Sequence, residues 1–279
     1  MGRAKLATLG AVFAVCAAAA FAFAQQPPPT VAVTASPTTV AVQAPGPLPA
    51  GPTRFEISRQ GSKDVSVYLL LLNAGVSQQE FEAAMRNDDR SGGESAVGLV
   101  SIQGSASLAG SKTARALTFT LKPGLTYLVL SEGGQGTAGH PQQRGTTTFT
   151  TSGESNGATP PAPDATVRMV GLRFRGDSTL PRRGVVRVEN ADGVPHFAVA
   201  FPLRTRVTTK QFGRALRAGS QRELGRVLSG TPYDLQGVIS GGNTANDNEV
   251  QFPKAGRYGL VCFFDEHHRL GMYRVVTVK

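Results

Sequence analysis

The chain has 279 residues, a formal charge of +10, four histidines, two cysteines and no tryptophan. This length allows one or two domains that each bury a core of their own. Two cysteines allow at most one disulfide, and they exclude a zinc ribbon or an iron–sulfur cluster held by four thiolates. The positive charge favours an acidic partner or an anionic cell envelope, and no aromatic motif accompanies it that would indicate nucleic-acid binding.

Residues 1–24 have the pattern of a secretory signal peptide. Arg3 and Lys5 precede a run of about 18 apolar residues that ends at Ala24, before two glutamines. We expect cleavage after Ala24 and export to the periplasm, the cell envelope or the outside of the cell. The alternative is an uncleaved membrane anchor, because about 18 apolar residues can just span a bilayer. Cleavage removes two positive charges, so the formal charge becomes +8. It also leaves Cys262 as the single cysteine. After cleavage we expect a chain that is not a transmembrane protein.

Two low-complexity stretches divide the rest of the chain. Residues 25–30 form a short Pro-rich linker, and residues 151–164, rich in Ser, Gly, Asn and Pro, indicate a second linker. Segments on either side of the second linker match each other at a constant offset, since residues 76–86 correspond to residues 207–217. The pattern predicts an internal duplication. The two expected domains cover residues 31–150 and 165–279.

Most of each half consists of short runs with alternating or β-branched character, such as residues 273–278, separated by Gly, Pro, Asn and Asp. This pattern is typical of an all-β sandwich or barrel. One helix is expected in each half, because Ser77-x-x-Glu80 and Thr208-x-x-Gln211 both have the form of a capping box. The predicted architecture is two β-sandwich domains, each with a short helical insertion.

The segment before the last predicted strand contains three side chains that can bind a metal. Cys262, His267 and Met272 have the spacing Cys-x4-His-x4-Met, and the strands on either side would bring these three side chains together at one end of a hairpin. His196, at the start of another predicted strand, supplies a second imidazole. One thiolate, two imidazoles and a thioether form the ligand set of a trigonal blue-copper site with a weak axial methionine.

On these residues the second half resembles the cupredoxins, the small blue copper proteins. The resemblance covers about residues 166–279, and it implies a Greek-key β-sandwich, so that the whole chain becomes two tandem cupredoxin-like domains. It also implies one mononuclear type 1 copper ion and one-electron transfer, with the electron leaving through His267. The implied ligands are His196, Cys262 and His267 in the trigonal plane and Met272 on the axis.

Two residues depart from the family's pattern. Phe197 stands where many members have an Asn that ties the two ligand loops together. His268 lies beside His267 and is an alternative ligand, although His267 fits the spacing better.

The first half resembles a cupredoxin domain without its metal. At the same offset, Val65 takes the place of His196 and Ser131 takes the place of Cys262. We therefore expect a degenerate domain that serves a structural or partner-binding role.

Other functions remain open at this point. Cys262 could be an inert buried residue, or a nucleophile paired with His196 or His267, although no motif marks an oxyanion hole. Multicopper oxidase chemistry lacks the His-x-His pairs that a trinuclear cluster needs, and a binuclear copper centre lacks a second cysteine in the loop. We expect an electron carrier with an acidic redox partner, and not an enzyme. The alternative is a copper-free cupredoxin-like extracellular binding module.

Overall fold

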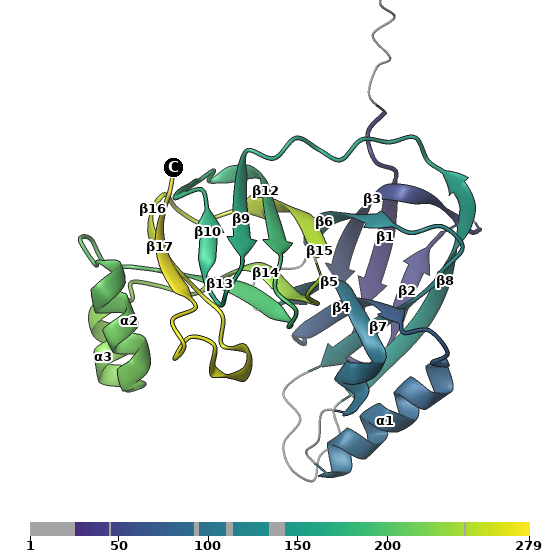
Figure 1. The fold of residues 1–279 in the computed structure, drawn as a ribbon, viewed down its shortest axis with the longest axis horizontal. Helices are drawn as coiled ribbons and strands as arrows, with labels where there is room; N and C mark the ends of the chain where they lie inside the picture. Colours follow the sequence, from purple (N-terminus) through teal and green to yellow (C-terminus); the bar gives the residue numbers. More distant parts are fainter. Residues whose placement is uncertain (1–25, 45, 92–94, 110–113, 134–142, 243) are drawn as a thin grey trace, which may run out of the picture.

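The computed structural model describes residues 26–44, 46–91, 95–109, 114–133, 143–242 and 244–279 (Figure 1). The expected signal peptide lies outside the described residues and stays a prediction. Within the described ranges, no helix is both long enough and apolar enough to cross a membrane.

Strands dominate both halves, as the sequence predicts. The first half contains β1 (Thr30–Ala35), β2 (Val40–Gln43), β3 (Leu48–Arg59), β4 (Val65–Leu72), β5 (Val100–Leu108), β6 (Ala114–Leu121), β7 (Thr126–Gly133) and β8 (Gln143–Ser155). The second half contains β9 (Ala165–Met169), β10 (Phe174–Gly176), β11 (Thr179–Leu180), β12 (Arg183–Asn190), β13 (His196–Pro202), β14 (Tyr233–Ile239), β15 (Thr244–Gln251), β16 (Gly256–Val261) and β17 (Tyr273–Val278).

The two halves have the same strand order. In the second half, β9, β12 and β15 form one layer and β17, β16, β13 and β14 form the other. In the first half, β1, β3 and β6 correspond to the first layer, and β8, β7, β4 and β5 correspond to the second. The directions agree as well, because β9 is parallel to β12 just as β1 is parallel to β3. The prediction of two β-sandwich domains is confirmed, and each sandwich buries its own apolar core.

The helical insertions also lie where the capping boxes predict them. α1 (Gln78–Ser91) follows Ser77, and α2 (Thr209–Ala218) follows Thr208, whose hydroxyl accepts a hydrogen bond from the backbone N–H of Gln211. A short helix, α3 (Gln221–Val227), extends the second insertion. Two 3₁₀ turns, η1 (Ser95–Leu99) and η2 (Phe264–Glu266), complete the regular structure.

The second linker is shorter than the sequence predicts. β8 continues to Ser155, so residues 151–155 are strand, and only residues 156–164 before β9 form neither helix nor strand. The Ser- and Gly-containing composition of residues 151–155 predicted a linker, but pairing with β3, in which Ala50 lies opposite Ser155, extends β8 through them.

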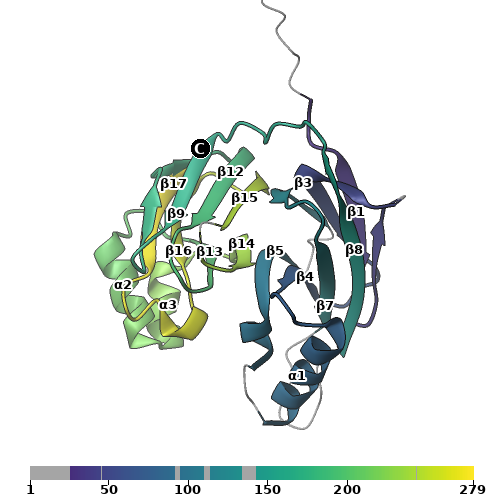
Figure 2. The ribbon, with the colours of Figure 1, turned by 45° about the vertical axis from the view of Figure 1, so that its right-hand side comes forward.

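The halves are joined by equivalent strands. β6 pairs antiparallel with β15, with Leu117 opposite Asn248, so the first layers of the two sandwiches form one continuous sheet. Next to this seam, β5 faces β14, and the hydroxyl of Ser105 donates to the carbonyl of Val238 at 2.9 Å. Figure 2 shows β5 and β14 between the two halves. The two domains therefore meet through sheet hydrogen bonds and not through the linker alone.

Candidate metal centre

The sheet of the second half places the first two candidate ligands. β13 and β16 run antiparallel with Val199 opposite Val261, so the start of β13 lies beside the end of β16. His196 is the first residue of β13, and Cys262 directly follows β16. Residues that are 66 positions apart in the sequence thus become neighbours.

The loop between β16 and β17 returns the third ligand to the same place. Asp265 and Glu266, within η2, both have left-handed backbone conformations, with φ of 41° and 55°, and they turn the chain sharply there. The amide of Met272 then donates to the carbonyl of His267 at 3.0 Å, and the amide of Cys262 donates to the carbonyl of Met272 at 3.2 Å. These bonds close the loop, so His267 and Met272 come back beside Cys262.

Three ligand atoms converge in this end of the sandwich. The Nδ1 atoms of His196 and His267 are 3.0 Å apart, and they lie 3.9 and 3.8 Å from Sγ of Cys262. A point in the plane of this triangle is about 2.1 Å from all three atoms, close to the roughly 2.0 to 2.3 Å at which imidazole nitrogen and thiolate sulfur bind transition metals. His196 and Cys262 are fully buried, and His267 is 6% exposed. The residues present therefore fit a mononuclear metal ion.

Met272 is fully buried in the same core cluster as Cys262. Its backbone, described above, places it at the base of the ligand loop. A thioether at this position suits the weak axial contact of a type 1 site. Its role as the axial ligand stays a prediction.

Asp192 is a functional residue that the sequence analysis missed. Its Oδ2 atom lies 2.9 Å from Nε2 of His196, and the same carboxylate accepts the backbone N–H groups of Gly171 and Leu172 at 2.6 and 3.1 Å. A carboxylate cannot donate, so Nε2 of His196 carries the proton and Nδ1 presents its lone pair to the site. Such a partner orients a metal-binding imidazole and increases its basicity. The sequence offered one signal for this role, namely an Asp four residues before His196.

Burial controls the protonation of the two fully buried ligands. Burial lowers the pKa of His196 below its usual 6.5, against the opposing effect of Asp192, so the imidazole is neutral at neutral pH. Burial also raises the pKa of the Cys262 thiol above 9.0, although the backbone N–H groups of Phe197 and Phe264 hydrogen-bond to its sulfur and partly oppose this shift. Cys262 is therefore a protonated thiol until a metal displaces its proton.

The missing Asn at position 197 does not leave the ligand loops untied. Besides Asp192, the guanidinium of Arg173 donates to the carbonyl of Leu270 at 2.7 Å and to the carbonyl of Leu172 at 2.8 Å. The turn after β9 thus holds Asp192 on one side and the ligand loop on the other. It supplies the support that Phe197 cannot provide through its side chain.

His268 does not join the ligand cluster. Its ring packs edge-on against Phe263 at 5.0 Å between ring centroids, and its buried Nδ1 atom has no hydrogen-bond partner among the described residues. His267, which precedes it, is the histidine that lies with His196 and Cys262.

The first half lacks an equivalent cluster among its described residues. Ser131, on β7, is fully buried, and its hydroxyl lies 3.3 Å from the carbonyl of Thr39. Val65 is buried in the apolar core of this half. A hydroxyl and a valine provide neither the thiolate nor the imidazole that the second half uses.

The chain is similar to several solved copper proteins. It covers 93% of auracyanin B at 21% identity over 43% of its own length, with a TM-score of 0.26. It covers 96% of auracyanin A, a "blue" copper protein from the green thermophilic photosynthetic bacterium Chloroflexus aurantiacus, at 16% identity over 41% of its own length, with a TM-score of 0.27. A multicopper oxidase matches 90% of this chain at 14% identity over 88% of its own length, with a TM-score of 0.25.

No protein-family model and no curated protein matches the chain. All of these TM-scores lie well below 0.5, so the metal centre is inferred from the geometry of its own residues and not from these similarities. Two sandwiches with one strand order, and a buried cluster of His196, Cys262 and His267, give the chain a cupredoxin-like fold with a ligand set that fits a single type 1 copper ion.

Proposed function

We propose that this chain is an exported copper protein that carries single electrons through one type 1 site. His196, Cys262 and His267 would hold the copper in a plane, and Met272 would be its weak axial ligand. The observation that carries the proposal is the triangle of Nδ1, Nδ1 and Sγ atoms with sides of 3.0, 3.8 and 3.9 Å. When bound, copper would supply one-electron exchange between its +1 and +2 states.

The ligands are held in place by groups of the protein itself. Asp192 fixes the ring of His196 from behind, and the backbone bonds of the ligand loop fix His267 and Met272. A site whose ligands are preorganised rearranges little when the charge at its centre changes. This supports electron transfer over a reaction that needs substrates to enter the first coordination sphere.

The surface near the site also supports contact with a partner. His267 is the most exposed of the three clustered ligands, and Val194, Phe263 and Leu270, each within a few residues of a ligand, are large apolar side chains exposed by 40 to 58%. An exposed apolar surface is a common feature of protein contact sites. We propose that an acidic redox partner docks there, because the formal charge of +8 that remains after loss of residues 1–24 favours its approach at low ionic strength.

Copper titration tests the proposal. Copper(II) added to the metal-free protein should produce an intense absorption at about 600 nm, which arises from charge transfer between thiolate and copper in type 1 sites. Cys262→Ser should abolish this band. Ser131→Ala is the matched control, because Ser131 takes the place of Cys262 in the first half, and the band should persist in it. Absence of the band from the unaltered protein would falsify the proposal and would leave a copper-free binding module.

A further inference from the structure

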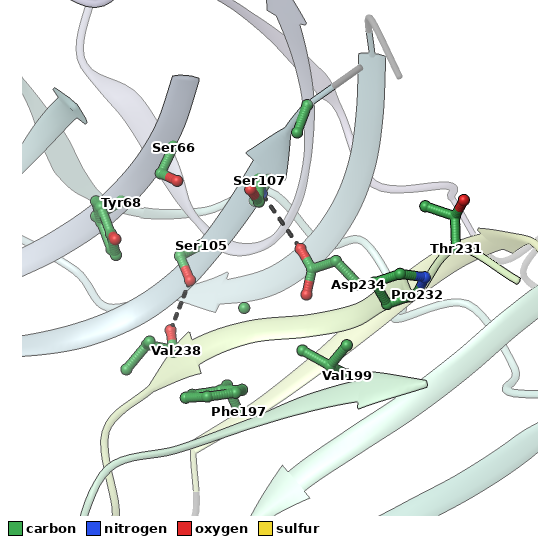
Figure 3. A pocket seen from close by; sticks show the side chains of 13 residues that line it. Ser66, Tyr68, Ser105, Ser107, Phe197, Val199, Thr231, Pro232, Asp234 and Val238 are labelled. Carbon is green, nitrogen blue, oxygen red and sulfur yellow. Dashed lines mark hydrogen bonds between the residues drawn. The ribbon is translucent and has the colours of Figure 1, made fainter. Parts of the chain in front are cut away.

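Two adjoining cavities lie between the halves of the molecule. The first, of about 480 Å³, is lined by strands β4 and β5 on one side and β13 and β14 on the other (Figure 3). The second, of about 380 Å³, lies between α1, β5 and the start of the ligand loop. Tyr68 and Val238 line both cavities, so the two are parts of one cleft. Cavities of about 300 to 1,000 Å³ are the size that small-molecule ligands occupy.

Two phenylalanines that line the cleft also lie beside the metal centre. Phe197 lines the first cavity, and Phe264 lines the second. These are the two residues whose backbone N–H groups hydrogen-bond to Sγ of Cys262. Both side chains pack against the core cluster that contains Cys262 and Met272, and the ring of Phe264 lies 5.7 Å from the ring of His267. A molecule in the cleft would therefore contact the side chains whose backbones hold the sulfur.

The lining of the cleft defines the ligand. Apolar and aromatic side chains predominate, and Figure 3 shows Phe197 and Val199 of the second half facing Ser66 and Ser105 of the first. Serine hydroxyls provide hydrogen-bond donors and acceptors at the wall. An apolar body with a polar group at one end would satisfy both surfaces.

Charge distinguishes the cleft from the rest of the protein. Asp88, Asp89, Glu132 and Asp234 line it, and Arg144 is the basic residue among its lining. Arg115 contacts Asp234 from outside the cleft at 3.2 Å, so four carboxylates face two guanidinium groups. This excess of negative charge occurs in a chain whose formal charge is +10. It favours a positively charged ligand and disfavours an anion.

We propose that the cleft between the halves binds a small aromatic amine, and that the bound molecule alters the copper site through Phe197 and Phe264. Hydrogen bonds to the cysteine sulfur tune the reduction potential of blue-copper sites. A ligand that moves either phenylalanine changes the length of an N–H···S bond. The copper-dependent part of this inference rests on the function proposed above, whereas binding in the cleft does not.

Binding is tested first on the metal-free full chain, with three probes of one shape and different charge: naphthylethylamine, naphthylethanol and naphthylacetate. The chain has no tryptophan, so naphthyl fluorescence is measured against tyrosine alone. The amine should bind most tightly, and the carboxylate should bind at least about tenfold more weakly. No measurable binding of the amine, or equal binding of amine and carboxylate, overturns the site.

Variants locate the binding. Val238→Phe and Ser66→Phe fill the cleft from opposite halves, and each should weaken binding of naphthylethylamine by about tenfold or more. Ser178→Phe adds the same ring at an exposed position outside the cleft and should leave the affinity unchanged. Because the two filling variants lie on different strands, failure of one to fold leaves the other as the test. Full affinity in a folded filling variant places the probe elsewhere and contradicts the proposal.

Coupling is then measured on the copper-loaded protein. The dissociation constant of naphthylethylamine should differ about fivefold between the Cu(I) and Cu(II) forms, and by linkage the amine should shift the reduction potential by the equivalent amount. The amine should also shift the visible absorption band. Equal dissociation constants in the two forms overturn the coupling. Binding to the metal-free protein without any copper uptake would instead retain the cleft and reject the proposed function.

Discussion

Oδ2 of Asp192 lies 2.9 Å from Nε2 of His196, four residues later in the chain. This contact fixes which nitrogen of the buried imidazole faces the metal centre, since the carboxylate can only accept. The same carboxylate binds two backbone amides of the turn after β9. One acidic side chain therefore sets both the tautomer of a ligand and the position of the loop behind it.

Replacing Asp192 by Asn should weaken copper binding by about 10- to 100-fold. In the native structure the N–H groups of Leu172 and His196 both donate to Oδ2. In the variant an NH₂ group takes the place of Oδ2, and because it is itself a donor it cannot accept these two hydrogen bonds. Competition with a chelator measures the affinity. Asp177→Asn removes another carboxylate from the same half, where it accepts the amide of Thr166 and contacts no histidine. Equal affinities in the two variants would show that Asp192 has no effect beyond its charge.

Copper uptake should become tighter as the pH rises through the neutral range. Burial raises the pKa of Cys262 above 9.0, so the thiol must lose a proton to the solvent when the metal binds. The pKa of His196 lies below 6.5, so this ligand releases no proton near pH 7. Between about pH 7 and 8.5 the affinity should rise about tenfold per pH unit. Chelator competition across this range gives the slope, and a flat profile would mean that Cys262 is not a thiolate ligand.

His267 and His268 form a natural matched pair of positions. His267→Ala removes one corner of the ligand triangle and should abolish the band at about 600 nm. His268→Ala removes a ring that contacts Phe263 and should leave the band in place. Absorption spectra of the two copper-loaded variants decide between the histidines. Loss of the band only in His268→Ala would reverse the assignment.

Met272→Leu should keep the visible band and raise the reduction potential. An axial thioether stabilises the oxidised metal weakly, and leucine replaces it with a side chain of similar volume that donates no electrons. Redox titration measures the potential, and the spectrum of the same sample shows whether the trigonal ligands remain. If the variant loses its colour as completely as Cys262→Ser, Met272 is not a weak axial ligand.

Arg115 is predicted to hold the two halves together. Its guanidinium, on β6 of the first half, contacts the carboxylate of Asp234 and donates to the carbonyl of Leu235 at 3.1 Å, both on β14 of the second half. Arg115→Leu should destabilise the fold by about 3 kcal/mol, because it leaves a partly buried carboxylate without its counter-charge. Urea unfolding gives the free energy. Arg115→Leu combined with Asp234→Asn should recover part of the loss, and an additive loss would contradict a direct pairing.

Local patterns in the sequence predicted much of the fold. The capping boxes at Ser77 and Thr208 each involve residues three positions apart, and both helices begin beside them. The constant offset between the halves predicted their common strand order. Cys262, His267 and Met272 are close in sequence, so a single hairpin is enough to bring them together.

Tertiary structure decided which more distant groups complete the site. His196 meets Cys262 only because the register of β13 and β16 places Val199 opposite Val261, and register depends on the packing of the whole sheet. The contact of Asp192 with His196 depends on the turn after β9, because the amides of Gly171 and Leu172 in that turn donate to the Asp192 carboxylate and hold it in place.

The sequence alone thus determined the identity and spacing of the candidate ligands and the repetition of the domains, because these are properties of short segments and of the chain compared with itself. The cleft between the halves was decided only in three dimensions. It exists because β6 pairs with β15 and thereby brings Tyr68 of one half near Phe197 of the other. No pattern within either half encodes that approach, since it arises where two complete surfaces meet.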